Sequence, residues 1–253
     1  MAKLSELELL FKKVEAKVVK GIFEYGLIED GDRIMIGLSG GKDSLALIDF
    51  LGRRMKIHRP KFELVVAHII MTNVPYHSDL EYLRAHTEQY GIPFIVHETS
   101  FDPTTDHRKS PCFLCSWNRR KAMFEVAKAN NCNKIALGHH QDDIIQTLLM
   151  NMTYQGAFST MPPKLKMEKF DMTIIRPMCL VEEKDLIRIA EWRGYKKQIK
   201  ACPYETSSSR PDMKEIVAKL EELNPHVRRN IWGSMANIQS DYLPQKHEEQ
   251  LID

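Results

Sequence analysis

The segment with the clearest chemical character is Ser39-Gly40-Gly41-Lys42-Asp43-Ser44, which follows a short apolar run and precedes a helical pattern. A strand that enters a helix through such a loop aims successive backbone N–H groups at one point. The glycines let the backbone approach phosphate oxygens, the lysine brings positive charge, and the serines bring hydroxyl donors. The loop therefore predicts a phosphate cradle, with a tight turn and a capping aspartate as the alternative.

The loop differs from a Walker A motif, which would need glycine at position 36, where the sequence has Ile36. It resembles instead the PP-loop of the N-type ATP pyrophosphatases. That resemblance implies that the β and γ phosphates of ATP are bound as a unit and that pyrophosphate leaves while AMP is attached to a substrate oxygen. We expect the loop and a Mg²⁺ ion to neutralise the leaving pyrophosphate together.

A second polar segment, Gly138-His139-His140-Gln141-Asp142-Asp143, follows the apolar run at 134–137 and opens another helical pattern. Two acids in the first turn of a helix are favoured by its dipole, so simple capping is one interpretation. Its position after a neighbouring strand predicts instead that an acid holds Mg²⁺ or acts on the reacting group. The PP-loop families carry a matching GHxxDD segment.

Three of the five cysteines lie beside prolines or turn-like residues, namely Cys112, Cys115 and Cys202. The first two form a CxxC pair that we expect just before a helix, whose N-terminus favours thiolates. Three cysteines without a fourth partner suit an open iron–sulfur cluster better than a closed zinc site. A redox dithiol, or a zinc site completed by a histidine such as His139, remains open. Cys132 and Cys179 are expected to be buried apolar residues.

These motifs sit in a regular alternation of strand-like and helical patterns. Apolar runs occur at 33–38, 62–70, 93–98, 134–137 and 173–177, and helical patterns at 43–55, 78–90, 116–130, 142–154 and 183–194. This alternation predicts an α/β fold, a Rossmann-like parallel sheet covered by helices on both faces. Ligands of such sheets bind beyond the carboxyl ends of the strands.

The chain of 253 residues is long enough for one α/β core with small additions at its ends. We expect an amphipathic helix in 1–27, a PP-loop ATP pyrophosphatase domain in 28–195 and a helical appendage in 196–253. No run of about 18 apolar residues is present to span a membrane. The first residues mix acids with lysines, unlike a secretory signal or transit peptide, so we expect a cytoplasmic protein. A net charge of +2 gives no general case for nucleic-acid binding.

The motifs together resemble the tRNA 2-thiocytidine synthetase family (TtcA), in matching order from about residue 8 to 240. They comprise Glu29-Asp30-Gly31-Asp32, the loop at 39–44, the CxxC pair followed by Arg119-Arg120, the segment at 138–143, Met161-Pro162-Pro163-Lys164, Arg176-Pro177 and Cys202. In other members the third cysteine opens a second CxxC, whereas Glu205 stands at that place here.

The resemblance implies thiolation of a cytidine in the tRNA anticodon loop, with tRNA and a sulfur donor such as a cysteine desulfurase as partners. Cys112, Cys115 and Cys202 would ligate a [4Fe-4S] cluster whose fourth iron is free to bind the transferred sulfur. ATP would adenylate the carbonyl oxygen of the base, and the sulfur would attack the same carbon.

The resemblance also assigns roles to charged residues. Arg119 occupies the place where a related thiolase group has a catalytic lysine. Because arginine stays protonated, we expect it to stabilise phosphate or the developing oxyanion. Asp43 and either Asp142 or Asp143 would assist nearby.

Three other functions remain open at this stage. The same adenylation and sulfur chemistry could act on another substrate, or the chain could be a tRNA lysidine synthetase, which shares the loop but needs no cysteines. It could also be an ATP-binding iron–sulfur carrier. The long first helix would suit either a homodimer contact or packing on its own domain.

Overall fold

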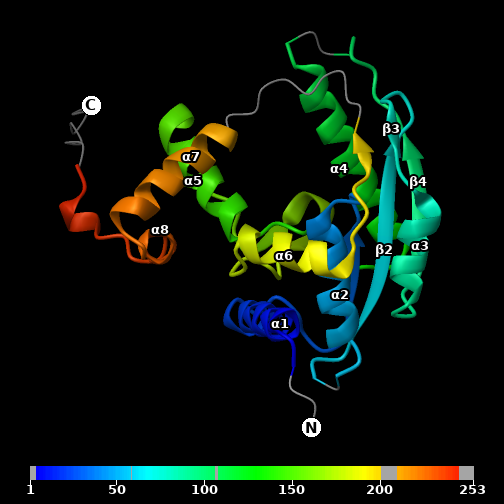
Figure 1. Cartoon of the computed structure of the whole chain (residues 1–253). Coiled ribbons are helices and arrows are strands. Elements are labelled where there is room, and N and C mark those ends of the chain that lie inside the picture. Colours follow the sequence, from blue (N-terminus) through cyan, green and yellow to red (C-terminus); the bar gives the residue numbers. More distant parts are fainter. Residues whose placement is uncertain (1–3, 58, 106–107, 201–209, 245–253) are drawn as a thin grey trace.

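The central sheet is mostly parallel, as the alternation of patterns predicted (Figure 1). The computed structural model describes residues 4–57, 59–105, 108–200 and 210–244. Within these residues the strand order is β4-β2-β1-β5-β7-β6, and only β6 runs antiparallel to its neighbour. The strands are β1 (Asp32–Gly37), β2 (Phe62–Met71), β4 (Phe94–Thr99), β5 (Lys134–Ala136), β6 (Lys164–Met167) and β7 (Met172–Ile175). A separate antiparallel pair joins β3 (Tyr76–His77) to β8 (Ile199–Lys200).

Helices cover both faces of the sheet, because successive strand residues point to opposite faces. On β1, Ile34 and Ile36 pack into the core shared with the first helices, whereas Met35 packs into the core under α4. The helices are α1 (Glu6–Glu24), α2 (Lys42–Arg54), α3 (Leu80–Glu88), α4 (Pro111–Ala129), α5 (Gln141–Gln155), α6 (Glu183–Arg193), α7 (Arg210–Leu223) and α8 (Val227–Ser234). In the described part of the chain, no helix has the length and apolarity that a membrane crossing requires.

The first helix packs on its own chain. Its apolar face enters the same core as α2 and α6, and the Phe11 ring lies 5.0 Å from that of Phe50 and 5.9 Å from that of Trp192. Ser5 and Glu8 form a capping box that begins the helix. The apolar face of α1 thus belongs to the core, and homodimer formation stays an untested expectation.

Ion pairs between strands hold the amino-terminal edge of the sheet. The Lys134 ammonium lies 2.7 Å from the Asp32 carboxylate, and both side chains are almost fully buried. Lys134 also donates to the Leu27 carbonyl at 3.1 Å. Lys164 on β6 reaches the Glu29 carboxylate at 3.3 Å. The acidic segment that begins at Glu29 therefore joins three strands at the edge opposite the predicted ligand site, a structural role.

Several boundaries differ from those expected. Helix α4 begins at Pro111 rather than near 116, because the Ser110 side chain accepts a hydrogen bond from the Phe113 N–H at 3.2 Å and proline is favourable in the first turn. Both CxxC cysteines thus lie inside the helix. Strand β6 was not expected, since its four residues carry two lysines. The predicted helical appendage contains α7 and α8, and α7 lies beside α5, away from the sheet (Figure 1).

The buried ion pair allows a matched test of stability. Asp32→Asn leaves the buried Lys134 ammonium without its closest charge partner, so we expect a loss of about 3 kcal/mol in the free energy of unfolding. Glu63→Gln breaks the exposed pair with Arg33 on neighbouring strands and should cost less than about 1 kcal/mol. Denaturant titration measures both values. Equal losses would contradict the structural role of the buried pair.

Candidate nucleotide and sulfur-transfer site

The loop between β1 and α2 has the shape of an anion cradle. Gly40 has a φ of +78°, a conformation that glycine adopts readily. Gly41 caps α2 without a side-chain hydrogen bond, so the first N–H groups of that helix stay open to a ligand. The Ser44 hydroxyl accepts from the Ser39 N–H at 3.2 Å and donates to the Gly41 carbonyl at 2.9 Å. Ser44 therefore closes the loop on itself.

The second polar segment touches this loop directly. Strands β1 and β5 are neighbours, with Ile36 paired to Ala136, so the loops that follow them leave the sheet side by side. A Cβ added to Gly138 would lie 3.0 Å from the carbonyl carbon of Asp43 and 3.1 Å from the Ser44 nitrogen. Glycine at 138 is thus required for the close approach of the two loops, which the structure brings together as predicted.

Lys42 is held between two carboxylates at the start of α2. Its ammonium donates to Asp43 Oδ2 at 3.2 Å and to Glu183 Oε1 at 3.2 Å. Burial alone would lower the pKa of Lys42, but the charges of Asp43 and Glu183 outweigh it and raise that pKa. Burial alone would raise the pKa of Glu183. The hydrogen bonds and charges of Lys214 and Lys42 outweigh burial and lower that pKa to about 2. Glu183 thus stays ionised and positions the loop lysine.

The two acids of the second segment have different surroundings. Asp142 is buried, its Oδ2 accepts from the Glu183 N–H at 2.7 Å, and its Oδ1 bonds to Arg228. Asp143 accepts from the His140 N–H at 3.1 Å and lies 3.7 Å from Arg210. Asp142 therefore uses both oxygens to hold α6 and α8, whereas Asp143 is more accessible.

Arg176, from the Arg176-Pro177 motif, links His139 to the Met161-Pro162-Pro163-Lys164 motif. The arginine donates from Nε to His139 Nδ1 at 3.2 Å, and its backbone N–H donates to the Pro163 carbonyl at 2.8 Å. Burial and the charge of Arg176 lower the pKa of His139 to about 4. The imidazole is therefore neutral near pH 7 and carries its proton on Nε2, because Nδ1 accepts the arginine hydrogen bond.

The cysteine pair lies at the same edge of the sheet as the two loops. Cys112 and Cys115 are half-buried near the start of α4, and Cys115 packs against an apolar cluster that includes Met71. Met71 is the last residue of β2, so the pair lies beyond the carboxyl end of that strand. Cys202 falls outside the described residues. Cysteines three positions apart on a helix fit two ligands of one cluster.

Arg119 carries a cation from α4 toward the nucleotide loop. It lies seven residues after Cys112, on the same face of the helix. Its Nε is buried and forms no hydrogen bond with the described residues. Burial lowers the pKa of His68, and the positive charge of Arg119 lowers it further. His68 Nδ1 is 2.7 Å from the Leu38 carbonyl, immediately before the nucleotide loop.

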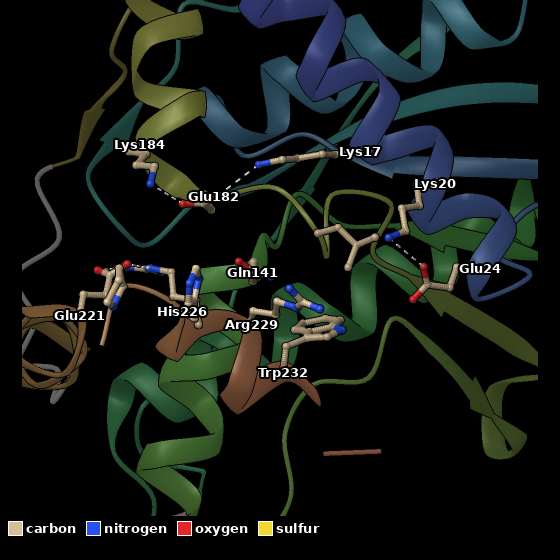
Figure 2. Close-up of a pocket in the computed structure, with 13 residues that line it drawn as sticks. Lys17, Lys20, Glu24, Gln141, Glu182, Lys184, Glu221, His226, Arg229 and Trp232 are labelled. Carbon is tan, nitrogen blue, oxygen red and sulfur yellow. Dashed lines mark hydrogen bonds and ion pairs between the residues drawn. The ribbon is translucent and has the colours of Figure 1, made fainter. Parts of the chain in front are cut away.

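A pocket of about 480 Å³ lies between α1, α6 and α8 (Figure 2). Its acids are paired: Glu182 lies 3.2 Å from Lys17 and 2.6 Å from Lys184, and Glu24 lies 3.6 Å from Lys20. Figure 2 shows these pairs and places Arg229 near Trp232. The pocket adjoins the nucleotide site through Gln141, next to Asp142.

No close group of three or more histidine, cysteine or acidic residues that could hold a metal ion is present in the described ranges. Asp43, Asp142 and Asp143 instead surround His140, at 4.0, 3.7 and 3.5 Å from its ring nitrogens. The three predicted catalytic acids are thus near one another. Of the predicted cluster ligands, Cys112 and Cys115 lie in the described part of the chain.

Cations from the C-terminal helices contact the acids of the site, and this arrangement could not be predicted from the sequence. Arg210 and Lys214 of α7 pair with Asp143 and Glu183, and Arg228 pairs with Asp142. The sequence shows Glu183 only as an acid at the start of a helix. Nothing in the local pattern links Arg228 to an aspartate 86 residues away.

Comparison with known proteins identifies the family of the chain. The model of the PP-loop domain family matches residues 10–217. A tRNA-cytidine(32) 2-sulfurtransferase from Syntrophotalea carbinolica is 37% identical over 243 residues, 92% of each chain. One from Burkholderia multivorans is 36% identical over 241 residues, 92% of this chain and 72% of the relative.

Among solved structures, the U34-tRNA thiolase NcsA from Methanococcus maripaludis, determined with its [4Fe-4S] cluster, shares the fold. Its TM-score is 0.73 at 23% identity, over 96% of this chain and 82% of that one. The predicted fold and family are confirmed: the chain belongs to the PP-loop proteins and, within them, to the tRNA-cytidine(32) 2-sulfurtransferase family.

Proposed function

We propose that this protein is an ATP-dependent tRNA sulfurtransferase that converts a cytidine of the anticodon loop, position 32 by the names of its relatives, to 2-thiocytidine. The observation that supports this function best is the convergence of three parts at one sheet edge: the nucleotide loop, the segment at 138–143, and the α4 face with Cys112, Cys115 and Arg119. In this arrangement one base could reach a nucleotide bound at the loop, the Arg119 cation and the thiols.

In the first half-reaction, the cytidine carbonyl oxygen attacks the α phosphorus of ATP and pyrophosphate leaves. Open N–H groups of α2 and the Lys42 ammonium stabilise the departing charge. Lys42 must then exchange its contact with Glu183 for one with phosphate. His139, neutral with its proton on Nε2, can donate a hydrogen bond but no positive charge. The product is an O-adenylated base, whose AMP is a good leaving group.

In the second half-reaction, a sulfur nucleophile attacks the activated carbon and AMP leaves. Arg119 is the cation best placed to stabilise the developing negative charge, because its buried Nε lacks a hydrogen-bond partner among the described residues. Cys112 and Cys115, with Cys202, would hold a [4Fe-4S] cluster. Such a cluster, when bound, would supply an iron without a protein ligand for the incoming sulfur.

We assign different roles to the three aspartates. Asp43 and Asp143 would bind Mg²⁺, which would neutralise charge on the phosphates. Asp142 would position α6 and α8, because both of its oxygens are already engaged. The proposal further includes a cytoplasmic location and a sulfur donor such as a cysteine desulfurase.

The function is tested by reconstitution. Anaerobically purified protein, ATP, Mg²⁺, a sulfide source and tRNA lacking 2-thiocytidine should yield that nucleoside, with pyrophosphate release that depends on tRNA. Mass spectrometry of digested tRNA measures the product. Release of pyrophosphate with free cytidine alone would indicate a small-molecule substrate, and no acceptor-dependent release would indicate an ATP-binding carrier. Either result would contradict the proposal.

Lys42 and Lys214 both form an ion pair with Glu183, so comparing variants of the two separates a role in phosphate binding from a role in ion pairing alone. Lys42→Met should lower tRNA-dependent pyrophosphate release by about 100-fold, because a donor to the leaving group is lost. Lys214→Met breaks the other ion pair of Glu183, at 2.9 Å on the exposed helix α7, and should change the rate less than about threefold. Similar losses in both variants would show that Lys42 serves only to hold Glu183.

The cluster has its own test in two cysteine variants. Cys115→Ser should abolish most of the bound iron and sulfide and the visible absorption of the anaerobic protein, since thiolates are the ligands of such clusters. Cys132→Ser replaces a buried cysteine packed under α4 and should leave iron content unchanged. A colourless wild type that contains zinc would refute the cluster assignment.

A further inference from the structure

The outer face of α4 exposes two large aromatic side chains on the helix that also carries Cys112 and Cys115. Phe113 is 47% exposed and Trp117 is 51% exposed. A lysine lies over each ring: the Lys109 ammonium is 4.9 Å from the centroid of Phe113, and that of Lys121 is 6.0 Å from Trp117. These four residues recur at every fourth position, and we call them the α4 aromatic stripe.

The stripe lies on the outer side of the helix and meets the cysteine face at Phe113. Each residue turns an α-helix by about 100°, so Phe113 is one step around the helix from Cys112, whereas Trp117 lies about 160° around the helix from both Cys115 and Arg119. A ligand that covers the stripe therefore reaches the thiols past Phe113, around the start of the helix. Leu114, on the inner side, anchors the helix in the apolar cluster with Met71.

We propose that the α4 aromatic stripe stacks unpaired bases of the tRNA loop that flank the modified cytidine. This inference rests on the proposed function and adds the surface that presents the substrate. A base whose carbonyl oxygen must reach the nucleotide site has to leave the stack of its neighbours. Those neighbours then need a new stacking partner, which exposed aromatic rings supply regardless of base identity.

The charge of the stripe favours RNA over an apolar protein partner. Both ends are lysines, Arg120 is also exposed on α4, and Glu125, which follows the stripe, lies 3.7 Å from Lys121. Two neighbouring rings with an ammonium group at each end match two stacked bases with phosphates on either side. A second copy of the chain would bring its own lysines to the same face.

Binding of a 17-nucleotide anticodon stem–loop, followed by fluorescence anisotropy, tests this surface. Trp117→Ala and Phe113→Ala should each weaken binding about fivefold or more, and Trp117→Phe should retain most of the affinity. Phe23→Ala is the matched control: this ring is 61% exposed beneath the Arg54 guanidinium, 5.4 Å away, at the opposite edge of the sheet. Binding of a fully paired hairpin should be unaffected by all four changes.

The possible outcomes separate this inference from the function. If the Trp117→Ala variant binds the stem–loop with the same affinity as the wild type, at unchanged iron content, the inference about the stripe is wrong. The proposed function would still stand. Absence of stem–loop binding by the wild type would contradict the function itself. A wild-type dimer that Trp117→Ala converts to a monomer without loss of RNA affinity would show that the stripe is an interface between copies, and would also overturn the inference.

Discussion

The backbone contact between Gly138 and the Asp43–Ser44 peptide is the constraint on which the site depends. Parallel pairing of β1 with β5 puts the two loops next to each other, and the lack of a side chain at 138 lets them touch. A methyl group there would lie about 3 Å from rigid backbone, where no side-chain movement can relieve the clash. The phosphate cradle and the acids beside it therefore hold their positions together.

Charge balance around the cradle depends on segments distant in sequence. Asp43, Asp142, Asp143 and Glu183 gather within one region, and lysine and arginine side chains from α2, α7 and α8 neutralise them. Clustered carboxylates would otherwise repel both one another and the phosphates of ATP. The C-terminal helices thus supply counter-ions for the acids around the loop between β1 and α2.

Under the proposed function, helix α4 links the sulfur chemistry to the nucleotide. Its inner face carries Cys112, Cys115 and Arg119 to the carboxyl ends of β1 and β2, while its outer face exposes Phe113 and Trp117. One rigid helix therefore sets the distances between thiols, cation and exposed rings. The proline and serine that start the helix at 111 decide this, because they place the cysteines on the helix instead of on the preceding loop.

The sequence by itself determined the α/β class, the five parallel strands and the two loops, because local apolar periodicity and glycine placement record them directly. Its motifs also identified the cysteines and the family. Only the tertiary structure decided that Asp142 binds the Glu183 backbone and Arg228, that burial and the charge of Arg176 keep His139 neutral, and that the Glu29 segment is structural. Each of these depends on side chains that are far apart along the chain, and local sequence patterns carry no information about such pairings.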